Sequence, residues 1–282
     1  VEKCKERVRK YSAIQTNQSI RLGQWMDWEN SYYTMSNENN AAIWHFLKKC
    51  KDKRLLYKGP DVVPWCWRCG TAISQHEILI EDYKEVTHDS VYIEYPVEGT
   101  ANAYLLVWTT TPWTLPGNAA VAVDPDKIYA EAVGLPAGRQ GEVKGGTYYL
   151  LKMAAERLNL KILRTFKGKE LLGLTYKSPF DDLPAVKKTL SGYTHKVVST
   201  DSRILPVSEE EGTGLVHIAP GQGVEDYRLS KKLKIPAVNL IDDAAVYLKG
   251  LGEFSGKNAK EHPEVIIDYL EARGFLFDSP KY

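Results

Sequence analysis

The 282-residue sequence contains no apolar run that approaches the ~20 residues required by a membrane-spanning helix. Residues 1–10 are rich in charge and no apolar segment follows them, so this end does not resemble a secretory signal peptide. Neither sign of charge predominates, since 37 Lys and Arg balance 36 Asp and Glu for a formal net charge of +1. This balance argues against a free-standing, non-specific nucleic-acid binder, although a local basic face is compatible with it. We expect a globular, cytoplasmic protein with no membrane partner.

Motifs of several common enzyme classes are also missing. The chain has no Gly-x-x-x-x-Gly-Lys-[Ser/Thr] loop for nucleoside triphosphates and no Gly-x-Gly-x-x-Gly motif that opens a helix after a strand. It also lacks the His-Glu-x-x-His zinc motif and the Gly-x-Ser-x-Gly nucleophile elbow. The familiar nucleophile and cofactor chemistries are therefore not supported.

Cysteine is scarce, with four residues in the chain, and only Cys66 and Cys69 are spaced as a Cys-x-x-Cys pair. This usage suits a reducing compartment and a metal knuckle better than a disulfide framework. The Gly-Thr that follows, with no helical pattern after it, favours half of a Cys4 zinc site over a thioredoxin-like redox motif. The other candidate ligands have no paired spacing: Cys4, Cys50, His45 and His76. We expect Cys66 and Cys69 to form a structural zinc half site.

The residues present predict an α/β fold that is rich in β-structure. Hydrophobic residues make up 43% and charged residues 26% of the chain, which excludes global disorder. Apolar periodicity predicts helices over 3–15, 37–51, 148–158, 224–233 and 262–273. It predicts strands over 91–95, 103–108, 119–123, 161–165, 212–219 and 237–241. The glycine-rich stretch from Gly134 to Gly146 predicts a loop or loose hairpin, and residues 85–245 form one compact β-rich domain.

The first segment that can carry chemistry follows a predicted buried strand and reads Trp-Thr-Thr-Thr-Pro-Trp-Thr-Leu-Pro-Gly-Asn over 108–118. Pro112 turns the chain, so that side chains and backbone N–H groups face one space. Threonine hydroxyls suit the recognition of a sugar or an ester without adding charge. A bare Thr-Thr-Thr is more often only the end of a strand. Two prolines, two tryptophans and an asparagine in eleven residues favour a functional site.

The second segment, Gly-Thr-Gly-Leu-Val-His-Ile-Ala-Pro over 212–220, places His217 near the end of a predicted strand. Asp226 falls in the first turn of the next helix, where the helix dipole is expected to keep its carboxylate ionised and able to receive a cationic amine. Each residue alone is more often structural, as a core histidine or a dipole partner. Facing one pocket, the two form an ordinary hydrolytic constellation.

These two segments resemble the editing domain of the isoleucyl-tRNA synthetases, which are class I aminoacyl-tRNA synthetases. Related valyl and leucyl enzymes carry Thr-Thr-Arg-Pro where this chain has Thr-Thr-Thr-Pro, so the resemblance is to the isoleucyl branch. Residues 24–32 (QWMDWENSY) and 56–66 (LYKGPDVVPWC) are also similar to that family. The His-Ile-Gly-His and Lys-Met-Ser-Lys-Ser signatures of amino-acid activation are absent from the 282 residues. The chain begins at Val1, and we expect it to be part of a longer isoleucine–tRNA ligase.

The resemblance implies a subdivision of the chain. Residues 1–60 would be a helical segment of the catalytic core or insertion stem, and 61–84 a half zinc knuckle with a linker. Residues 85–245 would be the editing domain, and 246–282 a segment returning toward the core. ATP and Mg²⁺ are implied only for the longer parent protein.

The resemblance also implies a function, the hydrolysis of the ester in tRNA(Ile) mischarged with valine, with no metal in the hydrolytic site. Asp226 would bind the substrate α-ammonium, while Thr109, Thr110, Thr111 and Trp113 would form the walls and contact the terminal ribose. Thr114 and His217 would set the size of the pocket, and Asn118 would make a polar contact near the ester. Among these, Thr110, Thr111, His217 and Asp226 are the candidate catalytic residues.

Two other hypotheses remain open. The chain could be a catalytically silent tRNA-binding insertion whose hydrolytic site has decayed, although the intact Thr-rich segment with His217 and Asp226 argues against this. It could also be a zinc-ribbon binding module, which only the Cys66–Cys69 pair supports.

Overall fold

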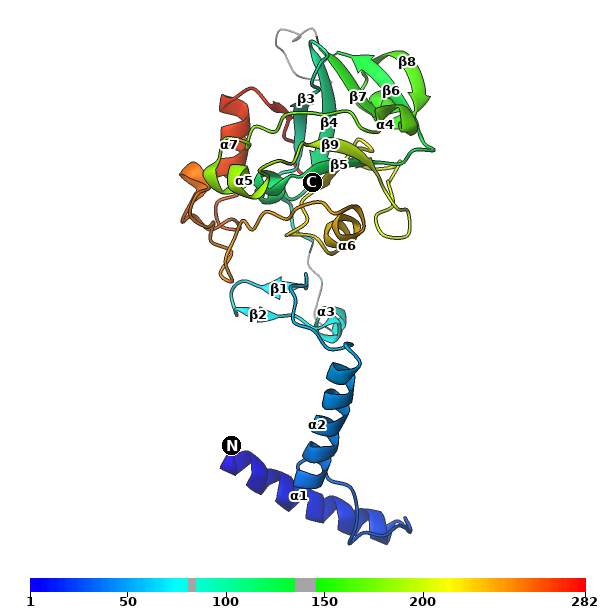
Figure 1. The fold of residues 1–282 in the computed structure, drawn as a ribbon, viewed down its shortest axis with the longest axis vertical. Helices are drawn as coiled ribbons and strands as arrows, with labels where there is room; N and C mark the ends of the chain where they lie inside the picture. Colours follow the sequence, from blue (N-terminus) through cyan, green and yellow to red (C-terminus); the bar gives the residue numbers. More distant parts are fainter. Residues whose placement is uncertain (81–84, 135–145) are drawn as a thin grey trace. The chain divides into compact units, whose positions relative to one another are not determined.

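The computed structural model describes residues 1–80, 85–134 and 146–282, and these form two compact units, Val1–Pro60 and Asp61–Tyr282 (Figure 1). The loop or hairpin expected over Gly134–Gly146 lies almost wholly outside the described residues. Within the described ranges, no helix has both the length and the apolar character needed to cross a bilayer.

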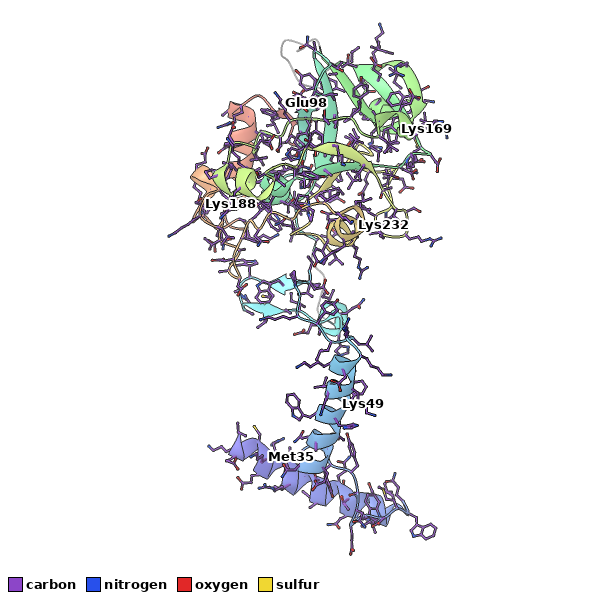
Figure 2. The ribbon with its side chains drawn as sticks, viewed as in Figure 1. Met35, Lys49, Glu98, Lys169, Lys188 and Lys232 are labelled. Atoms are coloured by element: carbon purple, nitrogen blue, oxygen red, sulfur yellow. The ribbon has the colours of Figure 1, made fainter. Side chains whose placement is uncertain are left out.

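The first unit contains two helices, α1 (Glu2–Arg21) and α2 (Asn37–Asp52). Both were predicted, and α1 is longer than expected. The N-cap of α2 is Ser36, whose side chain accepts a hydrogen bond from the Asn39 N–H at 3.1 Å. Neither helix buries a residue, and Figure 2 shows the side chains that the two helices carry.

The second unit begins with a short hairpin, β1 (Trp65–Cys66) and β2 (Thr71–Ala72), followed by α3 (Gln75–Ile80). Nine further strands of the described residues form one mixed sheet. They are β3 (Val91–Pro96), β4 (Ala103–Thr109), β5 (Ala120–Val123), β6 (Ile128–Val133), β7 (Thr147–Leu151), β8 (Lys161–Lys167), β9 (Lys196–Ser199), β10 (Val216–Ile218) and β11 (Leu276–Asp278).

Strand β4 organises this sheet (Figure 1). One edge of β4 pairs with β3 in antiparallel orientation. The other edge of β4 has two parallel neighbours. The first residues of β4 pair with β7, and Trp108, near the end of β4, pairs with Val216 of β10. The sheet therefore divides into a β8–β6–β7 part and a β10–β5–β9 part, in the manner of a half barrel. Because β4 and β10 are parallel, their carboxyl ends meet at the same edge.

The core of the sheet comes from the continuous apolar runs of the sequence. Leu105, Leu106 and Val107 of β4 are fully buried, as are all four residues of β5. Such runs are typical of strands covered on both faces. The buried centre fixes the backbone on which the site is built.

Shorter elements connect and cover the sheet. They are η1 (Pro112–Gly117), α4 (Lys152–Arg157), η2 (Gly168–Leu171), α5 (Pro184–Thr189), α6 (Val224–Leu233), η3 (Gly252–Phe254) and α7 (Glu264–Ala272). The predicted helices at α6 and α7 are confirmed, and α7 begins after Pro263 and is followed by Gly274 at φ +72°. Because β11 pairs with β3, the sheet includes residues beyond 245.

Three predicted elements are wrong in type or extent. Residues 147–151 form strand β7 rather than the start of a helix, because their backbone pairs with both β4 and β6. Only 216–218 of the predicted strand 212–219 is extended, because Gly212 and Gly214 have φ of +66° and +74°. Residues 237–241 form no strand, and Ile241 makes only an isolated bridge to Tyr247.

Candidate functional site

A cleft of about 530 Å³ lies at the carboxyl ends of β4 and β10, and we call it the β4–β10 cleft. Its walls come from the end of β4, η1, the 205–217 segment and the start of α6. Seven of the eight predicted hydrolytic-site residues line it, namely Thr109, Thr110, Thr111, Trp113, Thr114, His217 and Asp226. Asn118 is 1% exposed and is not part of the lining. The structure thus brings both motifs to one cavity although about 100 residues separate them.

The Thr-rich segment is ordered by its own hydrogen bonds. Thr109 Oγ1 accepts from the Thr111 N–H at 3.1 Å and lies 3.2 Å from Thr111 Oγ1. Thr111 then precedes Pro112, the first residue of η1, which turns the chain back toward the cleft. Within the described chain the half-buried Thr110 side chain has no hydrogen-bond partner, so its hydroxyl can bind a ligand.

His217 is held between two side chains through both of its ring nitrogens. Asn118 Nδ2 lies 2.7 Å from His217 Nδ1, and Thr114 Oγ1 lies 3.1 Å from His217 Nε2. The Thr114 hydroxyl donates its own hydrogen to the Thr111 carbonyl at 2.8 Å, so it accepts from His217. His217 is therefore the neutral tautomer protonated at Nε2.

Burial agrees with this neutral state of His217. The side chain is 7% exposed, and desolvation lowers its pKa to about 4. With both nitrogens engaged and the ring neutral, His217 shapes the wall of the cleft and holds Thr114.

Asp226 lies in the first turn of α6, as predicted, and its Oδ2 accepts from the Ala219 N–H at 3.0 Å. Desolvation raises the pKa of this carboxyl to about 6, against the lowering effect of the Ala219 hydrogen bond. The helix dipole therefore does not dominate, contrary to the sequence-based expectation. Above neutral pH the group is still mainly an anion in a half-buried position, which is the environment in which an ammonium binds well.

The sequence interpretation missed Thr213. This residue is 1% exposed, lines the β4–β10 cleft, and its hydroxyl has no hydrogen-bond partner in the described part of the chain. The flanking Gly212 and Gly214, both at positive φ, set the backbone that carries it. These two glycines were the available signal, because they mark a special backbone conformation rather than a strand.

Cys66 and Cys69 lie at the turn of the β1–β2 hairpin, where Cys66 Sγ accepts from the Cys69 N–H at 3.4 Å. Backbone hydrogen bonding lowers the pKa of the Cys66 thiol, which favours the thiolate that a metal requires. Among the described residues no group of three or more His, Cys, Asp or Glu side chains could hold a metal ion. The donor set therefore fits half of a tetrahedral zinc site, and zinc binding stays a prediction.

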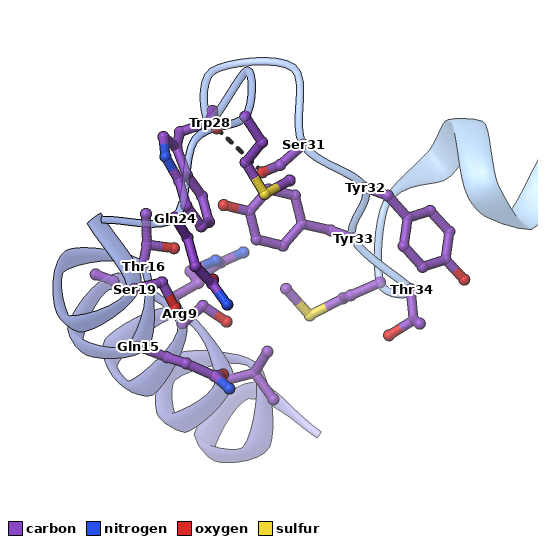
Figure 3. Close-up of a pocket in the computed structure, with 15 residues that line it drawn as sticks. Arg9, Gln15, Thr16, Ser19, Gln24, Trp28, Ser31, Tyr32, Tyr33 and Thr34 are labelled. Atoms are coloured by element: carbon purple, nitrogen blue, oxygen red, sulfur yellow. Dashed lines mark hydrogen bonds between the residues drawn. The ribbon is translucent and has the colours of Figure 1, made fainter. Parts of the chain in front are cut away.

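A separate cavity of about 660 Å³ belongs to the first unit, between α1 and the segment that leads to α2 (Figure 3). Its lining includes Arg9, Trp28 and Tyr33, and Ser31 donates a hydrogen bond to the Trp28 carbonyl at 3.0 Å. None of the predicted site residues lines this cavity.

Comparison with known proteins agrees with the fold and the motifs. Residues 1–263 match the model of the tRNA synthetases class I (I, L, M and V). The chain belongs to this family. Among its relatives, the isoleucine–tRNA ligase of Pyrococcus furiosus is 40% identical over 98% of this chain, and that of Sulfolobus acidocaldarius is 37% identical over 100%. The chain spans about a quarter of the length of these relatives, 26% in each case.

Solved structures show which part of such a synthetase the fold resembles. The crystal structure of GlLeuRS-CP1 superposes with a TM-score of 0.50 over 68% of this chain and 99% of its own, at 14% identity. The editing domain of the P. falciparum cytosolic leucyl-tRNA synthetase also gives a TM-score of 0.50, over 67% of this chain and 99% of its own, at 10% identity. At these identities the likeness concerns the fold alone. The β-rich α/β unit has the fold of a class I synthetase editing domain.

Proposed function

We propose that the β4–β10 cleft hydrolyses the aminoacyl ester of tRNA(Ile) mischarged with valine, as part of an isoleucine–tRNA ligase. One observation carries this proposal. A half-buried carboxylate, Asp226, faces the same cavity as the hydroxyls that follow β4, while His217 and Thr114 form a rigid neutral wall. A cation, a ribose and an ester are the groups that such a cavity can bind together.

Each side chain has a proposed role in holding the substrate. Asp226 binds the α-ammonium, which is the only cationic group of the valyl ester. Thr109, Thr110, Thr111 and Trp113 contact the terminal ribose and the ester, with the Thr110 hydroxyl free to donate or accept. His217 and Thr114 limit the space for the aliphatic side chain, and Asn118 acts on the cleft only through His217.

The reaction needs a water molecule and no metal ion. Water adds to the ester carbonyl carbon, the bond from that carbon to the ribose oxygen breaks, and the ribose oxygen takes up a proton. Valine and uncharged tRNA are the products. The residues of this chain orient the ester and the water, and such orientation is a large contribution to catalysis.

A second pocket is needed because binding alone separates the two amino acids poorly. One missing methylene changes binding by only ~1–3 kcal/mol, and the weak rejection of valine by isoleucyl enzymes is the well-known instance of this limit. A cavity too small for isoleucine but large enough for valine removes the error after it is made. The partners are then tRNA(Ile) and the rest of the parent synthetase, which would use ATP and Mg²⁺ outside this chain.

The main alternative is a silent module that binds tRNA but does not hydrolyse it. Hydrolysis of Val-tRNA(Ile) and Ile-tRNA(Ile) by the 282-residue chain distinguishes the two. The editing proposal predicts release of valine at a rate at least roughly tenfold above that of isoleucine. Equal rates, or rates no higher than spontaneous hydrolysis, would favour the silent module.

A further inference from the structure

A buried tyrosine stands behind the β4–β10 cleft in a continuous chain of hydrogen bonds. Tyr176 Oη donates to Asn118 Oδ1 at 2.6 Å, and the same amide contacts His217 Nδ1 at 2.7 Å through Nδ2. Tyr176 is not part of the cleft lining and belongs to neither sequence motif. In these contacts, Tyr176 is linked to the cleft through the hydrogen bonds of Asn118 and His217.

The Tyr176 ring is fixed in place by its neighbours. Its centroid lies 5.0 Å from that of Tyr95 and 5.2 Å from that of His195, and the side chain is 2% exposed. His195 is itself held by Asp181 at 2.7 Å and lies 3.2 Å from the Ala119 carbonyl oxygen. A ring clamped in this way presents its hydroxyl at one point, where it donates to Asn118 Oδ1 and holds the amide that contacts His217.

The orientation of the Asn118 amide decides which nitrogen of His217 carries the proton. Asn118 Nδ2 also donates to the Ala120 carbonyl at 3.1 Å, and a carbonyl can only accept. With Nδ2 facing His217, the Nδ1 atom must be an acceptor, and the ring proton lies on Nε2 toward Thr114. If the amide were reversed, Nδ1 would carry the proton and Thr114 would have to turn its hydroxyl away from the Thr111 carbonyl.

We propose that Tyr176 is a positioning residue of the cleft, whose hydroxyl, together with the Ala120 carbonyl, holds the Asn118 amide in the orientation that keeps His217 protonated at Nε2. Without this hydroxyl, Asn118 Oδ1 is buried with no donor, and among these contacts only the Ala120 carbonyl still favours the present orientation of the amide. The tautomer of His217 follows from contacts within the chain. Its consequence for catalysis rests on the proposed editing function.

The test is the ¹⁵N NMR spectrum of His217 in the 282-residue chain at neutral pH. The wild-type chain should give two well-separated ring signals, with the proton on Nε2. In Tyr176→Phe the two signals should move toward each other, because the ring then samples both tautomers. An unchanged His217 spectrum in a folded Tyr176→Phe chain would overturn the proposal.

Tyr95→Phe is the matched control. Tyr95 is fully buried beside Tyr176, and its hydroxyl has no hydrogen-bond partner in the parts of the chain that are described. Its removal should leave the His217 signals at their wild-type positions. An equal shift in both variants would mean that loss of any hydroxyl in this cluster disturbs the ring, which would also overturn the proposal.

Asn118→Asp keeps the question open to test if Tyr176→Phe does not fold. A carboxylate can only accept, so it should place the proton on Nδ1 and invert the two signals. A wild-type pattern in Asn118→Asp would show that this side chain does not set the tautomer.

Deacylation by Tyr176→Phe is expected to fall roughly tenfold, since a buried acceptor is left unpaired. If the NMR shift appears but the wild-type chain does not hydrolyse Val-tRNA(Ile), the proposed function fails and the positioning role stands.

Discussion

At the scale of single residues, burial shifts the pKa values of two cleft groups in opposite directions and reverses their order. Desolvation lowers the pKa of His217 to about 4 and raises that of Asp226 to about 6. Both shifts favour the neutral form, as expected for groups removed from water. His217 is therefore neutral in the working range of pH, whereas Asp226 is an anion that a bound ammonium would stabilise further.

These shifts contribute to stability with opposite dependence on pH. His217 takes up a proton near pH 6.5 in the unfolded chain and only near pH 4 in the folded chain. Its contribution to the free energy of unfolding is therefore fully present above pH 6.5 and is lost as the pH falls to 4. Asp226 ionises near pH 3.8 in the unfolded chain and near pH 6 in the folded chain. Its contribution to the free energy of unfolding is therefore fully present below pH 3.8 and is lost as the pH rises through 6. On acidification the two contributions oppose each other.

Asp226→Asn should therefore make the Asp61–Tyr282 unit more sensitive to acid. The loss in unfolding free energy between pH 6.5 and 4 should exceed that of the wild-type chain by ~1–2 kcal/mol, allowing for the partial exposure of Asp226. Urea unfolding at the two pH values measures this difference. Asp268→Asn, on the exposed face of α7, is the control. Equal losses in wild type and Asp226→Asn would show that Asp226 has no raised pKa.

At the scale of elements, the Gly-Thr-Gly segment before β10 explains both a wrong prediction and a feature of the site. The apolar residues of 215–219 predict a strand over 212–219, yet Gly212 and Gly214 adopt left-handed backbone. A Cβ on Gly214 would lie 2.1 Å from a carbon of Leu151, at the end of β7. The segment is shaped by this close approach rather than by strand pairing.

Gly214→Ala should therefore be strongly destabilising. Both the positive φ and the overlap with Leu151 oppose a side chain there, for an expected loss of ~2–4 kcal/mol. Gly192→Ala is the matched control, because Gly192 has φ +77° with open space around it and should lose only ~1 kcal/mol. Chemical unfolding of the two variants tests the difference, and similar losses would show that strain at φ alone matters.

The β1–β2 hairpin carries two thiols that would bind a zinc ion, and two ligands do not close a structural site. Zinc should therefore bind the 282-residue chain weakly, at less than one ion per chain after dialysis, and Cys66→Ser should abolish what is bound. Metal analysis with a chelator competition measures this. One tightly held zinc per chain would contradict the half site and would require further ligands from this chain.

Local sequence patterns were sufficient for elements that are set by their own periodicity. Helices α2 and α6 and strands β4 and β5 lie where their apolar residues predict them. Strand β7 was missed because its pattern of aromatic and aliphatic residues fits either structure, and pairing with β4 and β6 decides between them. Tertiary contacts also decide the structure of residues 237–241, which were predicted to form a strand. Their backbone bonds to loop residues instead of a neighbouring strand, as where Gln222 Nε2 donates to the Val238 carbonyl at 3.0 Å.

At the scale of the whole molecule, the two motifs are distant in sequence and adjacent in space because β4 and β10 are parallel neighbours. The motif residues could be predicted because each group is contiguous along the chain. Thr213 was missed because its role depends on the backbone conformation at Gly212 and Gly214, for which the two glycines were the only sequence signal. Tyr176 could not be predicted, since its role depends on a contact with Asn118, a residue 58 positions away. The buried position of Asn118 likewise follows only from the packing of β5 and its neighbours.

The most direct test of the account is the single-turnover rate of Val-tRNA(Ile) hydrolysis by the wild-type chain and by Asp226→Asn at pH 7.5. The asparagine keeps the shape and an oxygen that can accept from the Ala219 N–H, but it removes the charge that would bind the α-ammonium. Loss of such a charge pair typically costs ~2–5 kcal/mol, so the rate should fall roughly thirtyfold or more while the melting temperature changes little. A variant that melts lower yet hydrolyses at the wild-type rate would contradict the account and assign Asp226 to the scaffold.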